Sequence, residues 1–226
     1  MSSTEAKSTE ARQAGLAALL ALIAGYVDAY AFLNFQVYGS FMSGNTTQAG
    51  MQAGQGDLSG AGYNLLPIPL FVAGVFAGTL LVHSGLGRRL RWLFASVAVL
   101  LAVDMAAAAF GPVPGWFSIV SLSLAMGIMN TAVTSVGSQS ISPGYVSGTL
   151  NHLAQHLALA AKRVPLQDTL WPGDTHVRRA ALLAVIWTAF VVGALLAGVA
   201  TPSFAVGSLA IPLLILIVLA ASIRSN

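Results

Sequence analysis

Polar residues that could bind a solute recur in two places of an otherwise apolar chain. The first place holds Gly25-Tyr-Val-Asp28 and then Phe41-Met-Ser-Gly-Asn45-Thr, and the second holds Gly127-Ile-Met-Asn130 and then Tyr145-Val-Ser-Gly-Thr149. Aligned, Asp28 falls opposite Asn130, and the two Ser-Gly pairs coincide. A repeat inside an apolar chain indicates two related halves.

The alignment continues at a constant offset to a second polar pair in each half. Gln48 falls opposite His152 and Gln52 opposite His156. Residues four apart share one helix face, so each pair predicts a hydrogen-bonding wall along a solute pathway. Because a zinc site normally needs a third protein ligand and none lies nearby in the sequence, we predict no metal and no cofactor.

Composition indicates an integral membrane protein. Hydrophobic residues make up 56% of the chain and charged residues 8%, with a mean hydropathy of +0.79. This leaves too little polar surface for a soluble domain of 226 residues. The net charge of +3 comes from short basic clusters without interleaved aromatic residues, so it predicts membrane topology and no nucleic-acid binding.

The hydrophobic pattern predicts an all-α membrane protein with six transmembrane helices and two short re-entrant helices. The six runs cover residues 16–35, 65–83, 93–110, 116–136, 180–200 and 204–223. The short helices are expected at 44–56 and 147–162, where the sequence is too polar or too short for an ordinary span. Residues 1–13 are predicted to be a disordered cytoplasmic tail, and residues 14–226 a single membrane domain with repeats over 14–111 and 115–226.

The distribution of positive charge supports six spans. All ten Lys and Arg fall in five places, which are Lys7 and Arg12; Arg88, Arg89 and Arg91; Lys162 and Arg163; Arg178 and Arg179; and Arg224. Six spans, with both termini inside and both short helices re-entrant, put every one on the cytoplasmic side. Each half then has three spans, so the second half enters from the opposite face and the repeat is inverted.

The two short helices predict a binding site. Non-helical backbone at membrane depth needs a protein or water surround, so two re-entrant segments imply a cavity. Their beginnings, Ser43-Gly44-Asn45-Thr46 and Ser147-Gly148-Thr149, are suitable N-caps, and free amides there could bind an anionic or carbonyl-bearing solute. The alternative is that these Ser and Thr residues only cap two buried helix ends and contact no ligand. The predicted substrate-binding residues are Ser43, Gly44, Asn45, Thr46, Gln48, Gln52, Asn130, Ser147, Gly148, Thr149, Asn151, His152 and His156.

Two acidic residues lie inside predicted spans. An ionised Asp28 in an apolar span costs free energy unless it is paired, hydrated or protonated, so we predict that it carries the coupling proton. The alternative is a carboxyl group that Tyr26, Tyr30 or Asn130 holds neutral for helix packing. Asp104 is the second candidate for proton coupling.

The Gly25-Tyr-Val-Asp28 segment followed by Phe41-Met-Ser-Gly-Asn45-Thr resembles the signature of the YoaK family, and the resemblance covers most of the chain. This family consists of bacterial multi-span membrane proteins of unknown function that are suggested to export small metabolites. The resemblance implies a multi-pass protein of the bacterial cytoplasmic (inner) membrane. The resemblance implies little about chemistry, because the substrate of the family is not established.

The sequence leaves three functions open. The first is a proton-coupled secondary transporter that exports a small-molecule substrate across the lipid bilayer. The second is a passive channel, although the chain has no Asn-Pro-Ala pair and an acid in the first span suits coupling better. An intramembrane enzyme would need Ser43 or Ser147 to meet His152 or His156, and no nucleophile motif surrounds them, so we expect no enzyme. The sequence also allows the protein to form a homo-oligomer.

Overall fold

A computed structural model describes residues 3–85, 88–136, 139–140, 144–169 and 171–223. The chain divides into two compact units, each of which combines distant parts of the sequence. Unit 1 holds residues 1–25 and 133–193, and unit 2 holds residues 26–132 and 194–226. Both units take residues from both predicted repeats.

Helix α1 (Ser3–Phe35) begins in unit 1 and continues into unit 2. The prediction of a disordered tail over residues 1–13 is wrong from Ser3 onward, because this stretch is the first part of α1. Glu10 explains the order. Its carboxylate is buried, accepts a hydrogen bond from Trp171 Nε1 at 2.7 Å and pairs with Arg178 at 2.8 Å. These partners lie far away in the sequence, so local composition could not reveal them.

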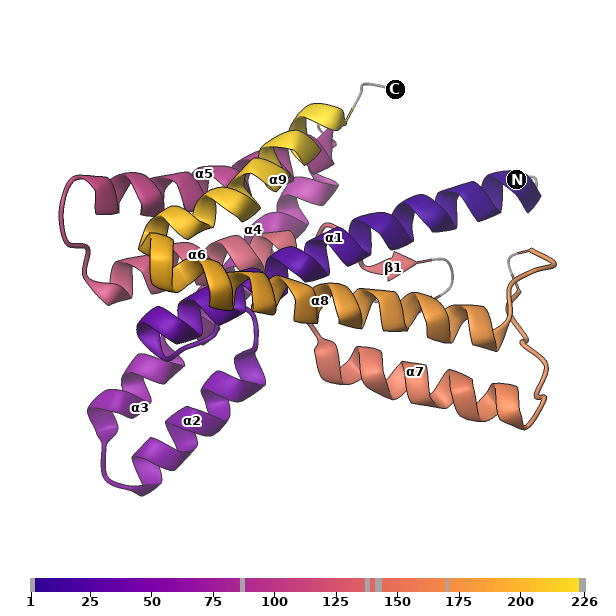
Figure 1. The fold of residues 1–226 in the computed structure, drawn as a ribbon, viewed down its shortest axis with the longest axis horizontal. Coiled ribbons are helices and arrows are strands. Elements are labelled where there is room, and N and C mark those ends of the chain that lie inside the picture. Colours follow the sequence, from indigo (N-terminus) through magenta and orange to yellow (C-terminus); the bar gives the residue numbers. More distant parts are fainter. Residues whose placement is uncertain (1–2, 86–87, 137–138, 141–143, 170, 224–226) are drawn as a thin grey trace. The chain divides into compact units, whose positions relative to one another are not determined.

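Unit 2 contains most of the helices. They are α2 (Met42–Gly54), α3 (Leu58–Leu65), α4 (Pro67–His83), α5 (Arg89–Ala109), α6 (Gly115–Met129), the 3-10 turn η1 (Ala205–Leu209) and α9 (Ala210–Ser222). Helices α4, α5 and α6 pack on one another, α9 packs along α5, and α2 forms a hairpin with α3 (Figure 1). Helices α4 and α6 approach closely through Gly74 and Gly127, where an added Cβ on either residue would collide with the backbone of the other helix.

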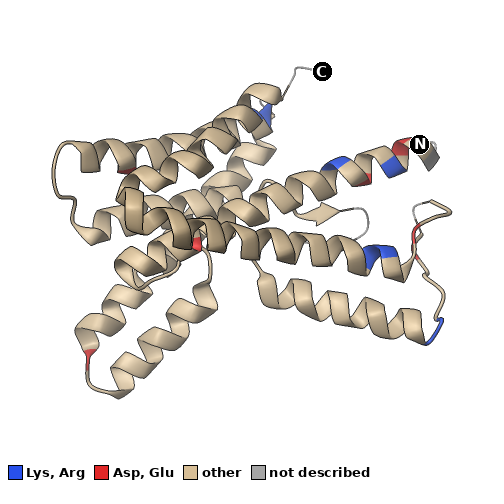
Figure 2. Ribbon diagram, in the orientation of Figure 1, with Lys and Arg blue, Asp and Glu red and all other residues tan. Residues whose placement is uncertain are grey.

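Unit 1 contains the first part of α1, a two-residue hairpin of β1 (Ser135–Val136) and β2 (Gln139–Ser140), α7 (Val146–Ala161) and the first part of α8 (His176–Phe204). Gly25 of α1 lies against the backbone of Phe190 in α8, where no side chain would fit. The basic residues at the start of α1, the end of α7 and the start of α8 gather at one end of this unit (Figure 2). This grouping is what a single membrane face requires.

Four segments of the described chain are long and apolar enough to cross a membrane: Thr4–Phe35, Leu58–His83, Arg89–Ala109 and His176–Ser222. A fifth apolar helix, α6, has 15 residues, or about 22 Å at the helical rise. Its predicted run continued to residue 136, but Asn130 ends the helix and Thr131 Oγ1 bonds back to the Ile128 carbonyl. The all-helical membrane architecture is supported, whereas six spans and the inverted repeat are not confirmed.

Candidate functional site

The loop of residues 36–41, which we call the connector, joins α1 to α2 and is fastened to Asp28. Ser40 donates its backbone N–H and its hydroxyl to the two carboxylate oxygens of Asp28, at 2.6 and 2.7 Å. The backbones of Gly39 and Phe41 also lie close to this carboxylate. Asp28 is only 4% exposed. Asp28 is therefore bonded to the connector through Ser40, whereas the hydroxyl of Tyr26 donates to the Ser208 carbonyl.

Asn45 of α2 fastens the same connector from its other side. Its amide accepts from the Tyr38 N–H and donates to the Tyr38 carbonyl, both at 2.8 Å, and the side chain is fully buried. The Tyr38 ring stacks on Phe32, with centroids 4.8 Å apart. The connector is therefore held from both sides, by Asp28 of α1 and by Asn45 of α2.

The two short helices begin with the same local structure. The N-cap residues are aromatic, Phe41 and Tyr145, with nearly equal backbone angles (φ −85°, ψ 72° and φ −97°, ψ 73°) and no side-chain cap bond. The prediction that Ser43 and Ser147 provide the caps is wrong, because each lies inside the first turn. Each aromatic ring instead covers the glycine three residues later, Gly44 or Gly148, where a Cβ would collide with the ring.

The second member of each repeated polar pair bonds to the helix that follows. Gln52 Oε1 accepts from Asn64 of α3 at 2.9 Å. His156 Nδ1 lies 2.7 Å from Nδ1 of His176, the first residue of α8. Both side chains thus tie a helix hairpin together. Sequence reasoning missed Asn64 and His176, since their partners lie 12 and 20 residues away along the chain.

A network of charged residues surrounds the histidine pair. Arg179 Nε and one terminal nitrogen bind both oxygens of Asp174, at 3.0 and 2.7 Å, and Arg179 also pairs with Asp168 at 3.3 Å. Burial, followed by the nearby His176 and Arg179, lowers the pKa of His156. The pair can share one proton between its Nδ1 atoms without both rings being charged.

Asp104 of α5 is fully buried. Ser118 and Tyr30 lie close enough to interact with its carboxyl group. Neither carboxyl oxygen makes a hydrogen bond of ordinary geometry with the residues that the structure describes. An ionised carboxylate without such bonds would be costly at this position, so Asp104 stays a candidate for proton coupling.

The other predicted substrate-binding residues occupy varied positions. Thr149 is buried and its hydroxyl bonds to the Tyr145 carbonyl. Asn130 is the C-cap of α6, and Gln48 is half-buried. The exposed residues are Ser43, Thr46, Ser147, Asn151 and His152. Since α2 belongs to unit 2 and α7 to unit 1, a cavity shared by the two helix starts stays a prediction.

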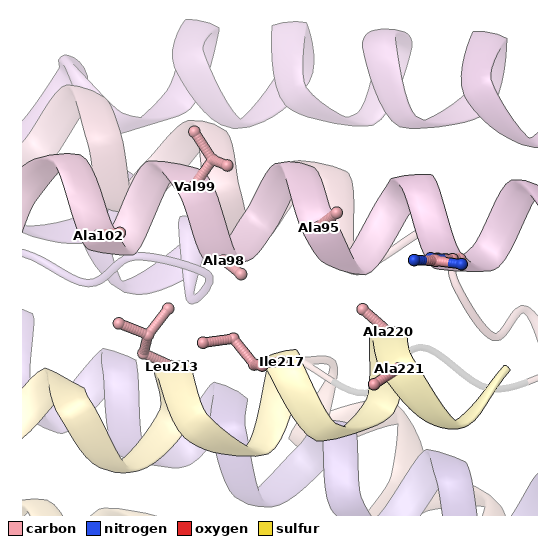
Figure 3. A pocket seen from close by; sticks show the side chains of 9 residues that line it. Ala95, Ala98, Val99, Ala102, Leu213, Ile217, Ala220 and Ala221 are labelled. Atoms are coloured by element: carbon pink, nitrogen blue, oxygen red, sulfur yellow. The ribbon is translucent and has the colours of Figure 1, made fainter.

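Unit 2 has an apolar groove of about 410 Å³ between α5 and α9. Leu213 and Ile217 point from α9 toward Ala98 of α5 (Figure 3). Arg91 also lines the groove. The lining is otherwise aliphatic and contains none of the predicted site residues. Within the described ranges, no group of three His, Cys, Asp or Glu side chains could hold a metal ion.

Comparison with known proteins gives one family. The sequence profile of a family described as "Protein of unknown function (DUF1275)" matches residues 16–222. The UPF0700 transmembrane protein YoaK of Bacillus subtilis (strain 168) is 29% identical over 201 residues, which cover 84% of each chain. No solved structure matches.

Proposed function

We propose that this chain, which belongs to the YoaK family of transmembrane proteins (DUF1275), is a proton-coupled secondary transporter that exports a small metabolite. The proposal rests on the two hydrogen bonds by which Asp28 binds Ser40 of the connector. Through these bonds, a titratable carboxylate in the apolar helix α1 contacts the loop that leads into the short polar helix α2. This is an arrangement in which proton binding can move a binding element.

The proposed coupling follows from the bonds of Asp28. The ionised carboxylate accepts charge-assisted hydrogen bonds from the N–H and the hydroxyl of Ser40. A proton on Asp28 removes the charge and one acceptor position, which weakens the hold on the connector. The connector leads directly into α2, so protonation would alter the position of the helix start at Gly44. Asn130, the aligned residue of the second half, cannot ionise, so only one half would respond.

The proposed topology has six spans, in the bacterial cytoplasmic membrane with both termini inside. The segment His176–Ser222 has 47 residues, more than twice the roughly 20 residues that one span needs, so α8 and α9 would each cross. Helix α6 would complete its crossing with the non-helical residues beyond Met129. The grouping of basic residues at one end of unit 1 supports this orientation.

We propose that the substrate is bound by the starts of α2 and α7, which share the Phe41/Gly44 and Tyr145/Gly148 arrangement. Broken helices flank the substrate in many transporters with inverted repeats. The alternating step would be rocking of one repeat against the other.

A transport assay on the purified protein tests the proposal. Proteoliposomes loaded with a defined mixture of small metabolites are given a pH gradient, and compounds that cross are identified by mass spectrometry. A coupled transporter moves a compound against its concentration gradient only while the pH gradient lasts. A channel would only equilibrate it at a rate that the pH gradient does not change, and formation of a product would indicate an enzyme. No compound crossing under either condition would refute transport.

A further inference from the structure

A pocket of about 330 Å³ lies in unit 1 between the end of α7 and the start of α8. Its polar lining includes Arg163, Thr175 and His176, and its apolar lining includes Val164 and Pro165. We propose that this pocket binds a small oxyanion, a carboxylate or a phosphate, through Arg163 and the Nε2 atom of His176. The site is separate from the substrate site proposed above and does not depend on it.

The strongest sign of a ligand is His176. Its side chain is only 8% exposed, and its Nε2 atom is buried without a hydrogen-bond partner among the described residues. An unsatisfied buried polar atom costs free energy unless a bound group completes its bonding. Nδ1 is already occupied by His156. If the Nδ1–H of His156 donates to His176 Nδ1, the neutral His176 ring carries its own proton on Nε2, and this N–H is available to donate to a bound ligand.

The start of α8 adds a second favourable element. The Thr175 hydroxyl accepts from the Arg178 N–H at 3.2 Å, and the Thr175 carbonyl accepts from the Arg179 N–H, so Thr175 is the N-cap. The N–H groups of His176 and Val177, both residues of the pocket lining, have no partner within the helix. A long helix concentrates partial positive charge at such an end.

The charges of the lining favour an anion over a cation. Asp174 also lines the pocket, but Arg179 binds both of its carboxylate oxygens, so its charge is compensated. Arg179 in turn is shared with Asp168. Arg163 takes part in none of the ion pairs of the described residues, which leaves it as the cation available to a ligand.

The pocket is held in shape by its surroundings. Trp171, in the loop before α8, donates to Glu10 of α1, and the Arg178 guanidinium lies 4.7 Å from the centre of its ring. Arg178 also pairs with Glu10 at 2.8 Å. This cluster fixes the loop and the first turn of α8 before any ligand arrives. A preformed site loses less entropy on binding.

Nuclear magnetic resonance on the full-length protein in detergent tests the proposal. The chain has four His, so ¹⁵N-histidine labelling gives a short set of ring signals, and His176→Gln identifies the one that belongs to His176. Inorganic phosphate and acetate are titrated separately at constant ionic strength with chloride. We expect one or both anions to shift the His176 Nε2 signal, and the arm that saturates distinguishes phosphate from carboxylate.

A pair of charge variants then separates the pocket from general electrostatics. Arg163→Gln should raise the dissociation constant about tenfold or more, since a charge-assisted bond is lost. Lys162→Gln removes the same charge one residue earlier, outside the lining, and should change it less than twofold. Neither variant alters a buried side chain. Equal effects of the two variants, or no shift of the His176 signal with either anion, would overturn the proposal.

Discussion

The carboxylate of Asp28, inside the apolar first helix, receives both the N–H and the hydroxyl of Ser40, at 2.6 and 2.7 Å. This contact joins a titratable group to a loop rather than to a neighbouring helix. A loop can move without repacking a helix bundle, whereas close-packed interiors resist small displacements. The contact therefore suits the proposed coupling, in which protonation of Asp28 would change the position of α2.

Replacement of Asp28 by Asn tests its role as the proton carrier. Asn keeps the size and one acceptor oxygen, so the protein should fold, while gradient-driven transport should fall to the rate seen without a pH gradient. The measurement is uptake by proteoliposomes with and without the gradient. Ser40→Ala is the matched control, because it removes one hydrogen bond to Asp28, at about 1 kcal/mol, and leaves the carboxylate able to titrate.

The outcomes are distinguishable. Well-folded Asp28→Asn protein with a full response to the gradient would exclude Asp28 and turn attention to Asp104. Loss of folded protein in Asp28→Asn, but not in Ser40→Ala, would indicate that the carboxylate is needed to hold the connector in place.

Asn45 is expected to stabilise the structure through the connector. Asn45→Ala leaves the N–H and carbonyl of Tyr38 without their side-chain partner, at a cost of about 1–3 kcal/mol for each group that stays buried. The measurement is the thermal unfolding midpoint in detergent. Thr46→Ala, at the next, exposed position, should change stability by less than about 0.5 kcal/mol. An equal midpoint for the two variants would show that the connector does not depend on Asn45.

The aromatic rings over Gly44 and Gly148 predict a specific rescue. Gly148→Ala should destabilise the protein, because the new Cβ would overlap the Tyr145 ring. Tyr145→Ala should remove that penalty, so a double-mutant cycle should give a coupling free energy of about 0.5–3 kcal/mol. Gly50→Ala is the control: its Cβ meets nothing within 4 Å, and alanine in a helix interior should be neutral or stabilising by up to about 1 kcal/mol. Additive effects of Gly148→Ala and Tyr145→Ala would contradict the proposed packing.

Sequence patterns predicted the apolar helices and placed the short helices within a few residues, because hydropathy and helix length are local properties. They did not predict that Ser40 binds Asp28 or that His176 binds His156, because neither partner shares a helix face or motif with the residue it contacts. The helical start of α1 was missed for the same reason, since its order depends on Trp171 and Arg178. The serine caps were misplaced because an aromatic ring on a glycine replaced the usual side-chain bond.

The histidine pair predicts a pH dependence of stability. The folded state lowers the pKa of His156, so the unfolded chain takes up a proton at higher pH than the folded protein does. Stability should therefore be lost as the pH falls below about 6.5, the ordinary value for histidine. In chloride buffer between pH 7 and pH 5, His156→Gln should show a smaller fall of the unfolding midpoint than the parent protein. His83→Gln, at the exposed end of α4 and not among the groups that act on His156, is the control and should follow the parent. Parallel curves for all three proteins would contradict this reading of the pair.

The proposed orientation of α2 and α3 can be tested directly, because the chain contains no Cys. Gln55 is exposed between α2 and α3, and Lys162 is exposed at the end of α7. If α2 is re-entrant from the outside and α7 from the inside, a membrane-impermeant maleimide should label Gln55→Cys in intact cells and Lys162→Cys only in inverted vesicles. Each variant serves as the sidedness control for the other, and labelling after detergent treatment confirms that both thiols react.

Labelling of Gln55→Cys only in inverted vesicles would mean that α2 crosses the membrane. The first half would then have an even number of crossings before α4, and both the inverted repeat and a site between two re-entrant helix starts would have to be abandoned.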